Sequence, residues 1–209
     1  MDRRRYAIWE GKTWGTLGDS ITAAGGYQPL VGEALGFARI YNLGRSGCPM
    51  AAGTDRDDGA TVNVGAAMEE RPDCVTIFAG VNDFRLGIPI GGVGGKDVRT
   101  FAGAYAALIE RLLAANPSCR INLWTPLQRD KDGYDIHYVN DAGHRLIDYA
   151  ETVLQIGRLY ALPVLDLYAE SGINRLTLPV YTTDGVHPNE AGHLRIAGMA
   201  IPFLERIGQ

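Results

Sequence analysis

The chain has 209 residues, of which 46% are hydrophobic and 21% are charged, and its formal net charge at pH 7 is −4. These ordinary values exclude disorder, coiled coil and collagen-like repeats, and the acidic balance offers no electrostatic surface for nucleic acid. The length suits one α/β domain, so we expect residues 1–209 to form a single domain with residues 1–12 as an N-terminal extension.

In chain order, apolar periodicity and turn residues predict a strand at 16–18, a helix at 27–37, a strand at 38–43, a helix at 61–71, a strand at 73–79, a helix at 97–115, a strand at 120–126, a helix at 139–160, a strand at 162–167 and a helix at 188–207. Pro188 is expected in the first turn of the last helix. This alternation predicts an α/β three-layer sandwich, in which a five-stranded parallel sheet is flanked by helices.

Residues 84–96 contain five glycines, and we expect them to form a long flexible excursion that could act as a lid. Its apolar residues either shield an acyl chain or pack against another subunit, so a homo-oligomer stays open. The walls of the binding pocket are expected from three loops: residues 49–60, 84–96 and 128–138.

The basic run at residues 3–5 is followed by an apolar stretch that Glu10 and Lys12 interrupt, so no secretory h-region is predicted. No later segment approaches the length of a membrane span. The three cysteines are too few and too scattered for a disulfide framework, and they match no zinc spacing: Cys48, Cys74 and Cys119. We expect a cytoplasmic protein, with secretion left open if a signal segment was removed.

Ser20 follows the first strand in the stretch Gly-Asp-Ser-Ile, where a strand that leaves the core through Gly18 would deliver it to the start of the next helix. A serine there has a hydroxyl facing solvent and unpaired helix amides nearby, which favour negative charge. The alternative is that Ser20 only caps this helix.

Asp184 and His187 lie three residues apart in the loop before the last helix. A serine nucleophile needs a base, and the base needs a partner that fixes its tautomer. In parallel sheets the strand-end loops meet at one edge, so this pair could meet Ser20 there. The alternative is an ordinary Asp-Gly turn with a histidine at the surface.

Acyl transfer also needs donors for the developing oxyanion. The sequence offers the backbone N–H of Ser20, the backbone N–H of Gly44 at the end of the second strand, and the side-chain amide of Asn82 after the third. Alternatively, Gly44 serves a turn and Asn82 bonds its own loop.

Together, the segments 18–21, 42–44, 80–83 and 184–187 resemble the four motif blocks of the SGNH hydrolases, also called GDSL esterases, in the family's order. The resemblance spans almost the whole chain, with Ile21 where the name-giving pattern has Leu. It implies a flavodoxin-like sheet and hydrolysis of carboxylic esters through an acyl-enzyme, without a metal or another cofactor. It also implies Ser20 as nucleophile, His187 as base, Asp184 as its orienting carboxylate, and Gly44 and Asn82 as oxyanion donors.

The substrate is expected to be a small ester, with short-chain or acetyl esters favoured over two open alternatives, carbohydrate O-acetyl esters and lysophospholipids or thioesters. One rival hypothesis is a metal enzyme using His137, His144 and His193, although their spacing matches no recognised ligand pattern. Another is a non-catalytic binding module that keeps the fold and the pocket.

Overall fold

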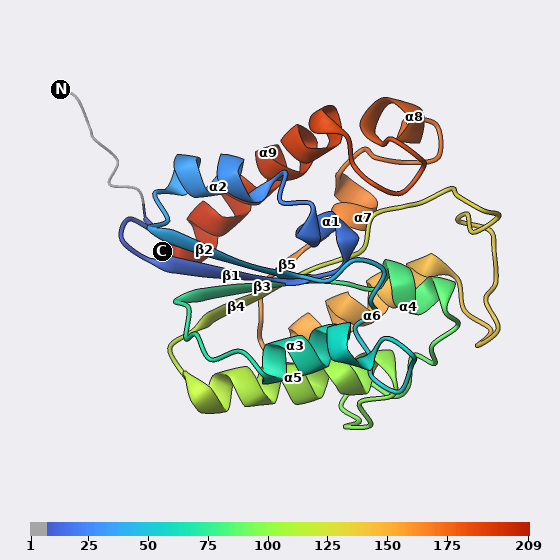
Figure 1. Cartoon of the computed structure of the whole chain (residues 1–209), viewed down its shortest axis with the longest axis horizontal. Coiled ribbons are helices and arrows are strands. Elements are labelled where there is room, and N and C mark those ends of the chain that lie inside the picture. The colour runs from blue at the N-terminus through green and yellow to red at the C-terminus, as the bar shows by residue number, and fades with distance from the viewer. Residues whose placement is uncertain (1–7) are drawn as a thin grey trace.

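The computed structural model describes residues 8–209 (Figure 1) and contains one five-stranded sheet in which every strand pair is parallel. The strands are β1 (Thr13–Gly18), β2 (Arg39–Gly44), β3 (Cys74–Phe78), β4 (Arg120–Trp124) and β5 (Val164–Leu165). Their order across the sheet is β2-β1-β3-β4-β5, the order of flavodoxin-like folds. The predicted fold class is therefore confirmed.

Helices cover both faces of the sheet, as Figure 1 shows. One face carries α1 (Ser20–Ala23), α2 (Gln28–Leu35), α7 (Leu167–Glu170), α8 (Leu178–Tyr181) and α9 (Glu190–Gly208). The other carries α3 (Thr61–Ala66), α4 (Val81–Arg85), α5 (Phe101–Ala115) and α6 (Leu146–Leu159). A short 3₁₀ helix, η1 (Asp57–Gly59), precedes α3.

The central strands are buried on both faces because they alternate between two hydrophobic cores. In β3, Val75 and Ile77 join the core beneath α3, α5 and α6, whereas Cys74 and Phe78 join the core beneath α2 and α9. This double burial explains the nearly continuous apolar run in the sequence.

The predicted helix at 139–160 begins only at Leu146, because Asn140 organises a loop before it. Its side-chain oxygen accepts the N–H groups of Ala142 and His144, and its amide nitrogen donates to the carbonyl of Phe84 and the hydroxyl of Tyr149. Asparagine competes in this way with helical bonding. The apolar pattern alone could not reveal this competition.

Other boundaries also differ from the predictions, among them the end of α3 and the start of α9. The helix predicted at 61–71 ends at Ala66, and residues 67–73 connect it to β3. Residues 69–71 are charged and exposed, so no packing on the core extends the helix through them. The last helix is capped by Asn189, whose side chain accepts the N–H of Gly192, so Pro188 lies outside the helix and forms a β-bridge with Thr182.

The glycine-rich segment at 84–96 begins inside α4 and is anchored in the core through its first half. Phe84, Ile88 and Ile90 are buried, and the Ile88 carbonyl accepts the hydroxyl of Tyr149 at 2.5 Å. The expectation that these three side chains shield an acyl chain or a second subunit is wrong, because they fill this domain's own core.

Trp9 binds the start of the described chain to its end. The indole is 4% exposed, stacks on Phe37, and donates its Nε1–H to the carbonyl of Leu204 in α9 at 3.0 Å. Residues 1–7 of the predicted extension lie outside the described residues. Among residues 8–209, no helix has both the length and the apolar character needed to cross a membrane.

Gly18 and Gly44 end β1 and β2 side by side and allow α1 to approach the sheet edge closely. The two residues are register partners, and a side-chain carbon on Gly44 would collide with the backbone of Ala23. A carbon on Gly18 would collide with the carbonyl of Phe78 in β3. Glycine is therefore required where the chain turns from β1 into α1.

We predict that Gly44→Ala lowers the free energy of unfolding by about 1–3 kcal/mol, because overpacking forces backbone shifts. The matched control is Gly198→Ala on the exposed side of α9, where nothing lies within 4 Å of the added carbon. There the better helix former should stabilise by roughly 0.5–1 kcal/mol. Urea denaturation measures both changes, and equal effects would contradict the close approach.

Candidate active site

Ser20 is the first residue of α1 and is half-buried at the carboxyl edge of the sheet. The capping role goes to Asp19, whose carboxylate accepts the N–H of Ile21 at 2.9 Å. Since Asp19 caps the helix, the Ser20 hydroxyl is free for another partner, and the alternative that Ser20 itself is the cap does not hold.

The loop between α8 and α9 brings Asp184 and His187 together. Asp184 Oδ1 accepts the backbone N–H groups of Val186 at 3.1 Å and His187 at 2.8 Å, and Oδ2 lies 2.8 Å from His187 Nδ1. Gly185 has a φ of +83° and packs on the carbonyl of Asp130, where a side chain would collide. Local turn bonds therefore fix the carboxylate against the ring.

His187 Nε2 lies 2.9 Å from Ser20 Oγ, although 167 residues separate the two in sequence. An ionised carboxylate can only accept, so the contact with Asp184 places a proton on His187 Nδ1. Nε2 of the neutral ring is then left to accept the hydroxyl proton of Ser20. The three residues predicted from the sequence thus form one continuous hydrogen-bond chain.

Lys131 adds a charge that the sequence reading missed. Its Nζ lies 2.6 Å from Asp184 Oδ2, the same oxygen that contacts the histidine. Burial alone would raise the pKa of Asp184, but hydrogen bonds from the His187 amide, Lys131, the His187 ring and the Val186 amide outweigh it and lower the pKa well below its usual range. The carboxylate therefore stays ionised at neutral pH.

Two of the three predicted oxyanion donors, Ser20 and Asn82, line a cavity of about 750 Å³. His187 lines the same cavity. One N–H of the Asn82 amide donates to the carbonyl of Cys48 at 3.1 Å, which fixes the side chain and leaves the second N–H without a partner in the part of the chain that the structure describes.

Gly44, the third predicted donor, packs beside Ala23, which lines the cavity, but is not itself part of the lining. Its N–H donates to the side-chain oxygen of Asn42 at 3.1 Å. Gly47 lines the cavity instead, with a φ of +72° and a backbone N–H that bonds to no other described residue. Gly44 and Gly47 are only three residues apart in the sequence. They differ because Gly44 is the last residue of β2, whereas Gly47 lies in the loop after the strand.

The remaining lining of this cavity is strongly basic. It includes Arg56, Arg85, Arg129 and Lys131, with Asp132 as an acidic neighbour. These side chains come from all three loops that were expected to form the pocket walls, at 49–60, 84–96 and 128–138. The basic cavity contrasts with the net charge of −4 for the whole chain.

Two carboxyl groups are buried behind the cavity. Burial raises the pKa of Asp19 to about 6 and that of Asp83 to about 7, even though each accepts backbone hydrogen bonds. Asp83 accepts the N–H groups of Met50 at 2.8 Å and Ala51 at 3.1 Å. It therefore ties the loop after β2 to α4, which carries Asn82.

The three histidines of the metal hypothesis lie on different parts of the structure. His193 packs near the ring of Tyr27, and His144 near that of Tyr149, with ring centroids 6.4 and 6.2 Å apart. The backbone N–H of His137 donates to Asp135. Within residues 8–209, no group of three or more His, Cys, Asp or Glu side chains is arranged to hold a metal ion.

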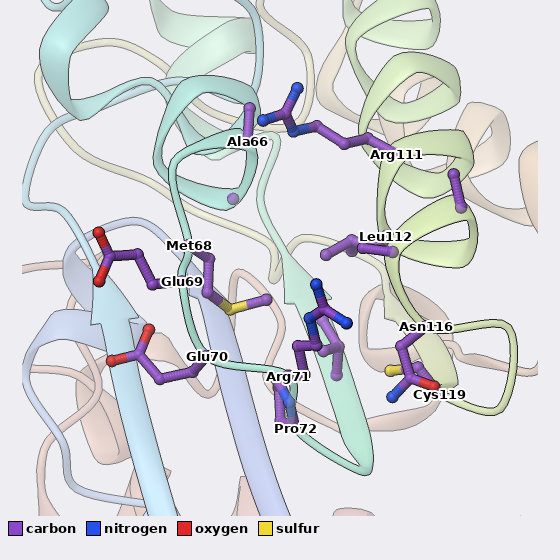
Figure 2. Close-up of a pocket in the computed structure, with 14 residues that line it drawn as sticks. Ala66, Met68, Glu69, Glu70, Arg71, Pro72, Arg111, Leu112, Asn116 and Cys119 are labelled. Carbon is purple, nitrogen blue, oxygen red and sulfur yellow. The ribbon is translucent and has the colours of Figure 1, made fainter.

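A second cavity, of about 600 Å³, lies at the opposite edge of the sheet between the loop after α3 and the end of α5. Figure 2 shows Met68 and Leu112 pointing toward one another across it. Its lining includes Cys119, but burial, with a smaller effect of Asp73, raises the pKa of that thiol to about 12. Such a thiol is a poor nucleophile, and the lining of this second cavity includes none of Ser20, Asp184 and His187.

Comparison with known proteins gives a consistent picture. A sequence model of the GDSL-like lipase/acylhydrolase family matches residues 16–195. No curated protein matches the chain significantly.

Solved structures share the fold over nearly the whole chain. A protein from Lactobacillus plantarum is 29% identical, with a TM-score of 0.83, and the alignment covers 94% of this chain and 98% of that one. A possible lipase from Chitinophaga pinensis is 23% identical, with a TM-score of 0.77 and coverages of 94% and 99%. The acetyl xylan esterase AlAXEase is 24% identical, with a TM-score of 0.66 and coverages of 90% and 97%.

The raised pKa of Asp83 predicts a pH dependence of stability. Between about pH 4 and 7 the unfolded chain has lost this proton while the folded protein keeps it, so Asp83 makes stability fall as pH rises through this window, by up to about 1.4 kcal/mol per pH unit. In Asp83→Asn, which carries no titrating proton at this position, the contribution of Asp83 should be absent, so that the remaining decline, to which Asp19 contributes through its pKa of about 6, is smaller than in the wild type. Urea denaturation at pH 4.5 and 7 tests it, and equal pH slopes in both proteins would contradict it.

Proposed function

The chain belongs to the GDSL-like lipase/acylhydrolase family, and from this premise we propose that it is a serine hydrolase that cleaves carboxylic esters through an acyl-enzyme. The observation that carries the proposal is the hydrogen-bond chain from Asp184 through His187 to Ser20. Nucleophile, base and orienting acid are each within hydrogen-bond distance of the next, as such catalysis requires.

In this mechanism Ser20 Oγ attacks the ester carbonyl while His187 Nε2 takes its proton. Asp184 holds the ring and stabilises the imidazolium that forms. The tetrahedral intermediate then collapses, His187 returns the proton to the departing alcohol, and Ser20 carries the acyl group. A water activated by His187 attacks this acyl-enzyme in the same manner and releases the acid.

We assign the oxyanion to three donors, the backbone N–H of Ser20, the backbone N–H of Gly47 and the side-chain amide of Asn82. Gly47 replaces Gly44 in this assignment, because Gly47 lines the cavity and its N–H has no partner within residues 8–209, whereas the Gly44 N–H is bonded to Asn42. The start of α1 favours negative charge at the same place.

The preferred substrates are short-chain or acetyl esters. The apolar members of the lining of this cavity of about 750 Å³ are small side chains, Ala23, Ala24, Val81 and Val186, which suit a short acyl group better than a long one. Carbohydrate O-acetyl esters also carry a short acyl group and fit the cavity in the same way. Lysophospholipids and long-chain thioesters carry a long acyl chain and fit it less well.

Ser20→Ala is expected to lower kcat/KM for 4-nitrophenyl acetate by about four orders of magnitude or more, because the nucleophile acts as a unit with its base. Ser118→Ala, in an exposed turn at the far end of the sheet, is the matched control and should retain full activity. A fluorophosphonate probe should label the wild type and fail to label Ser20→Ala. Undiminished hydrolysis by a folded Ser20→Ala protein would remove Ser20 from the mechanism, and an unlabelled wild type would favour the non-catalytic binding module.

Asn82→Ala should lower kcat by about 100- to 1000-fold with a small change in KM, since an oxyanion contact strengthens in the transition state. The melting temperature must be measured beside the kinetics, because Asn82 also bonds to Cys48. A change confined to KM would count against the assigned role.

A further inference from the structure

Arg129 is a buried cation at the wall of the candidate active site. The residue is 3% exposed and lines the cavity together with Ser20, His187 and Arg85. It follows β4 in the loop that also supplies Lys131, the partner of Asp184. A buried guanidinium normally has a carboxylate partner, because an unpaired charge is costly to remove from water.

The contacts of Arg129 leave most of its hydrogen-bonding capacity unused. Nη2 makes a long bond of 3.4 Å to the carbonyl of Lys131, and the guanidinium lies 5.4 Å from the ring centre of Tyr134. The Nε–H is buried without a hydrogen-bond partner among the described residues. A guanidinium has five N–H donors, so a ligand with two oxygens would find donors here.

The charges around Arg129 do not neutralise it by direct contact. Asp19, Asp132 and Asp184 attract it from a distance, but none of them forms an ion pair with it among the described residues, and Asp184 is bound to Lys131. Burial, followed by repulsion from Arg85, lowers the pKa of Arg129. The two arginines therefore border one cavity with their charges uncompensated at short range.

We propose that the ester substrate carries an anionic group, a carboxylate or a phosphate, which Arg129 and Arg85 bind beside the scissile bond. An anion between the two guanidinium groups would relieve their repulsion and supply the oxygen acceptors that Arg129 lacks. Arginine presents a planar fork that matches both carboxylate and phosphate. This inference rests on the proposed hydrolase function and narrows its substrate class.

The test compares matched ester pairs on the whole 209-residue chain. For an anion on the acyl side, the pair is 4-nitrophenyl hydrogen adipate and its methyl ester, because the longer chain keeps the carboxylate from attacking its own ester. For an anion on the alcohol side, 4-acetoxybenzoate and 4-acetoxyphenyl phosphate are compared with methyl 4-acetoxybenzoate. Each kcat/KM is divided by the rate of hydroxide hydrolysis of the same ester, so intrinsic reactivity cancels.

We expect the wild type to prefer the anionic member of at least one pair by about 10- to 100-fold, the range of a charge-assisted hydrogen bond. Arg129→Gln and Arg85→Gln should each reduce this ratio by about 10-fold. The matched control Arg39→Gln, on an exposed arginine at the opposite end of β2, should leave the ratio unchanged. Equal rates on both members of every pair would overturn the inference.

The ratio of kcat/KM for the anionic ester to kcat/KM for the neutral ester distinguishes a binding role of Arg129 from a structural role. If Arg129 only supported the fold, Arg129→Gln would slow both members of a pair alike and lower the melting temperature without changing the ratio, and this result would overturn its role. Arg85 is only half-buried. If Arg129→Gln fails to fold, the same ratio measured in Arg85→Gln therefore tests the inference.

A binding experiment distinguishes failure of the inference from failure of the proposed function. Ser20→Ala is titrated with 4-hydroxybenzoate and with inorganic phosphate by calorimetry, with Arg129 intact or changed to Gln. Binding that depends on Arg129, in a wild type that hydrolyses no ester, would refute the hydrolase function and support the anion site. Hydrolysis of neutral esters without any anion binding would support the function and refute the site.

Discussion

The contact between Asp184 Oδ2 and His187 Nδ1 is the interaction on which the geometry of the site depends. It determines which ring nitrogen carries the proton, and so which nitrogen can face Ser20. Asp184 can make this contact because two backbone amides of its own turn hold the other oxygen. Together with the His187 amide, Lys131, which shares the contacted oxygen, lowers the pKa of the carboxyl group. The orientation of the imidazole is thus set by four residues of one turn and by one lysine from a neighbouring loop.

The parallel sheet brings that turn to the serine. Since all five strands run in the same direction, the loops after β1, β2, β3 and β4 open on one edge, and the loop before α9 closes over it. Gly18 and Gly44 allow α1 to begin directly at that edge, and Asp83 ties the loop after β2 to α4. Gly18, Gly44 and Asp83 therefore fix the positions of backbone segments. The side chains of Ser20 and Asn82 extend from these segments.

Much of this arrangement could be predicted from the sequence, because its strongest signals are local. The run at 73–79 shows a strand buried on both faces, and the apolar recurrence between 97 and 115 shows α5, although the helix proper begins at Phe101. The residues Ser20, Asp184 and His187 were found through motifs. Asn140 and Arg129 were not found, since the roles of these side chains depend on partners that only the folded chain brings near. The choice between Gly44 and Gly47 likewise depended on where β2 ends.

The packing of Trp9 against α9 has a practical consequence. Ile8 and Trp9 lie against Gly208, so the start of the described chain and its last residues are neighbours at the edge where the strands begin. The cavity that Ser20 and His187 line opens at the other edge. A surface tether, an affinity handle or a fused protein placed at the carboxyl terminus would therefore leave the entrance clear, and a short peptide joining position 209 to position 8 offers a route to circularly permuted chains.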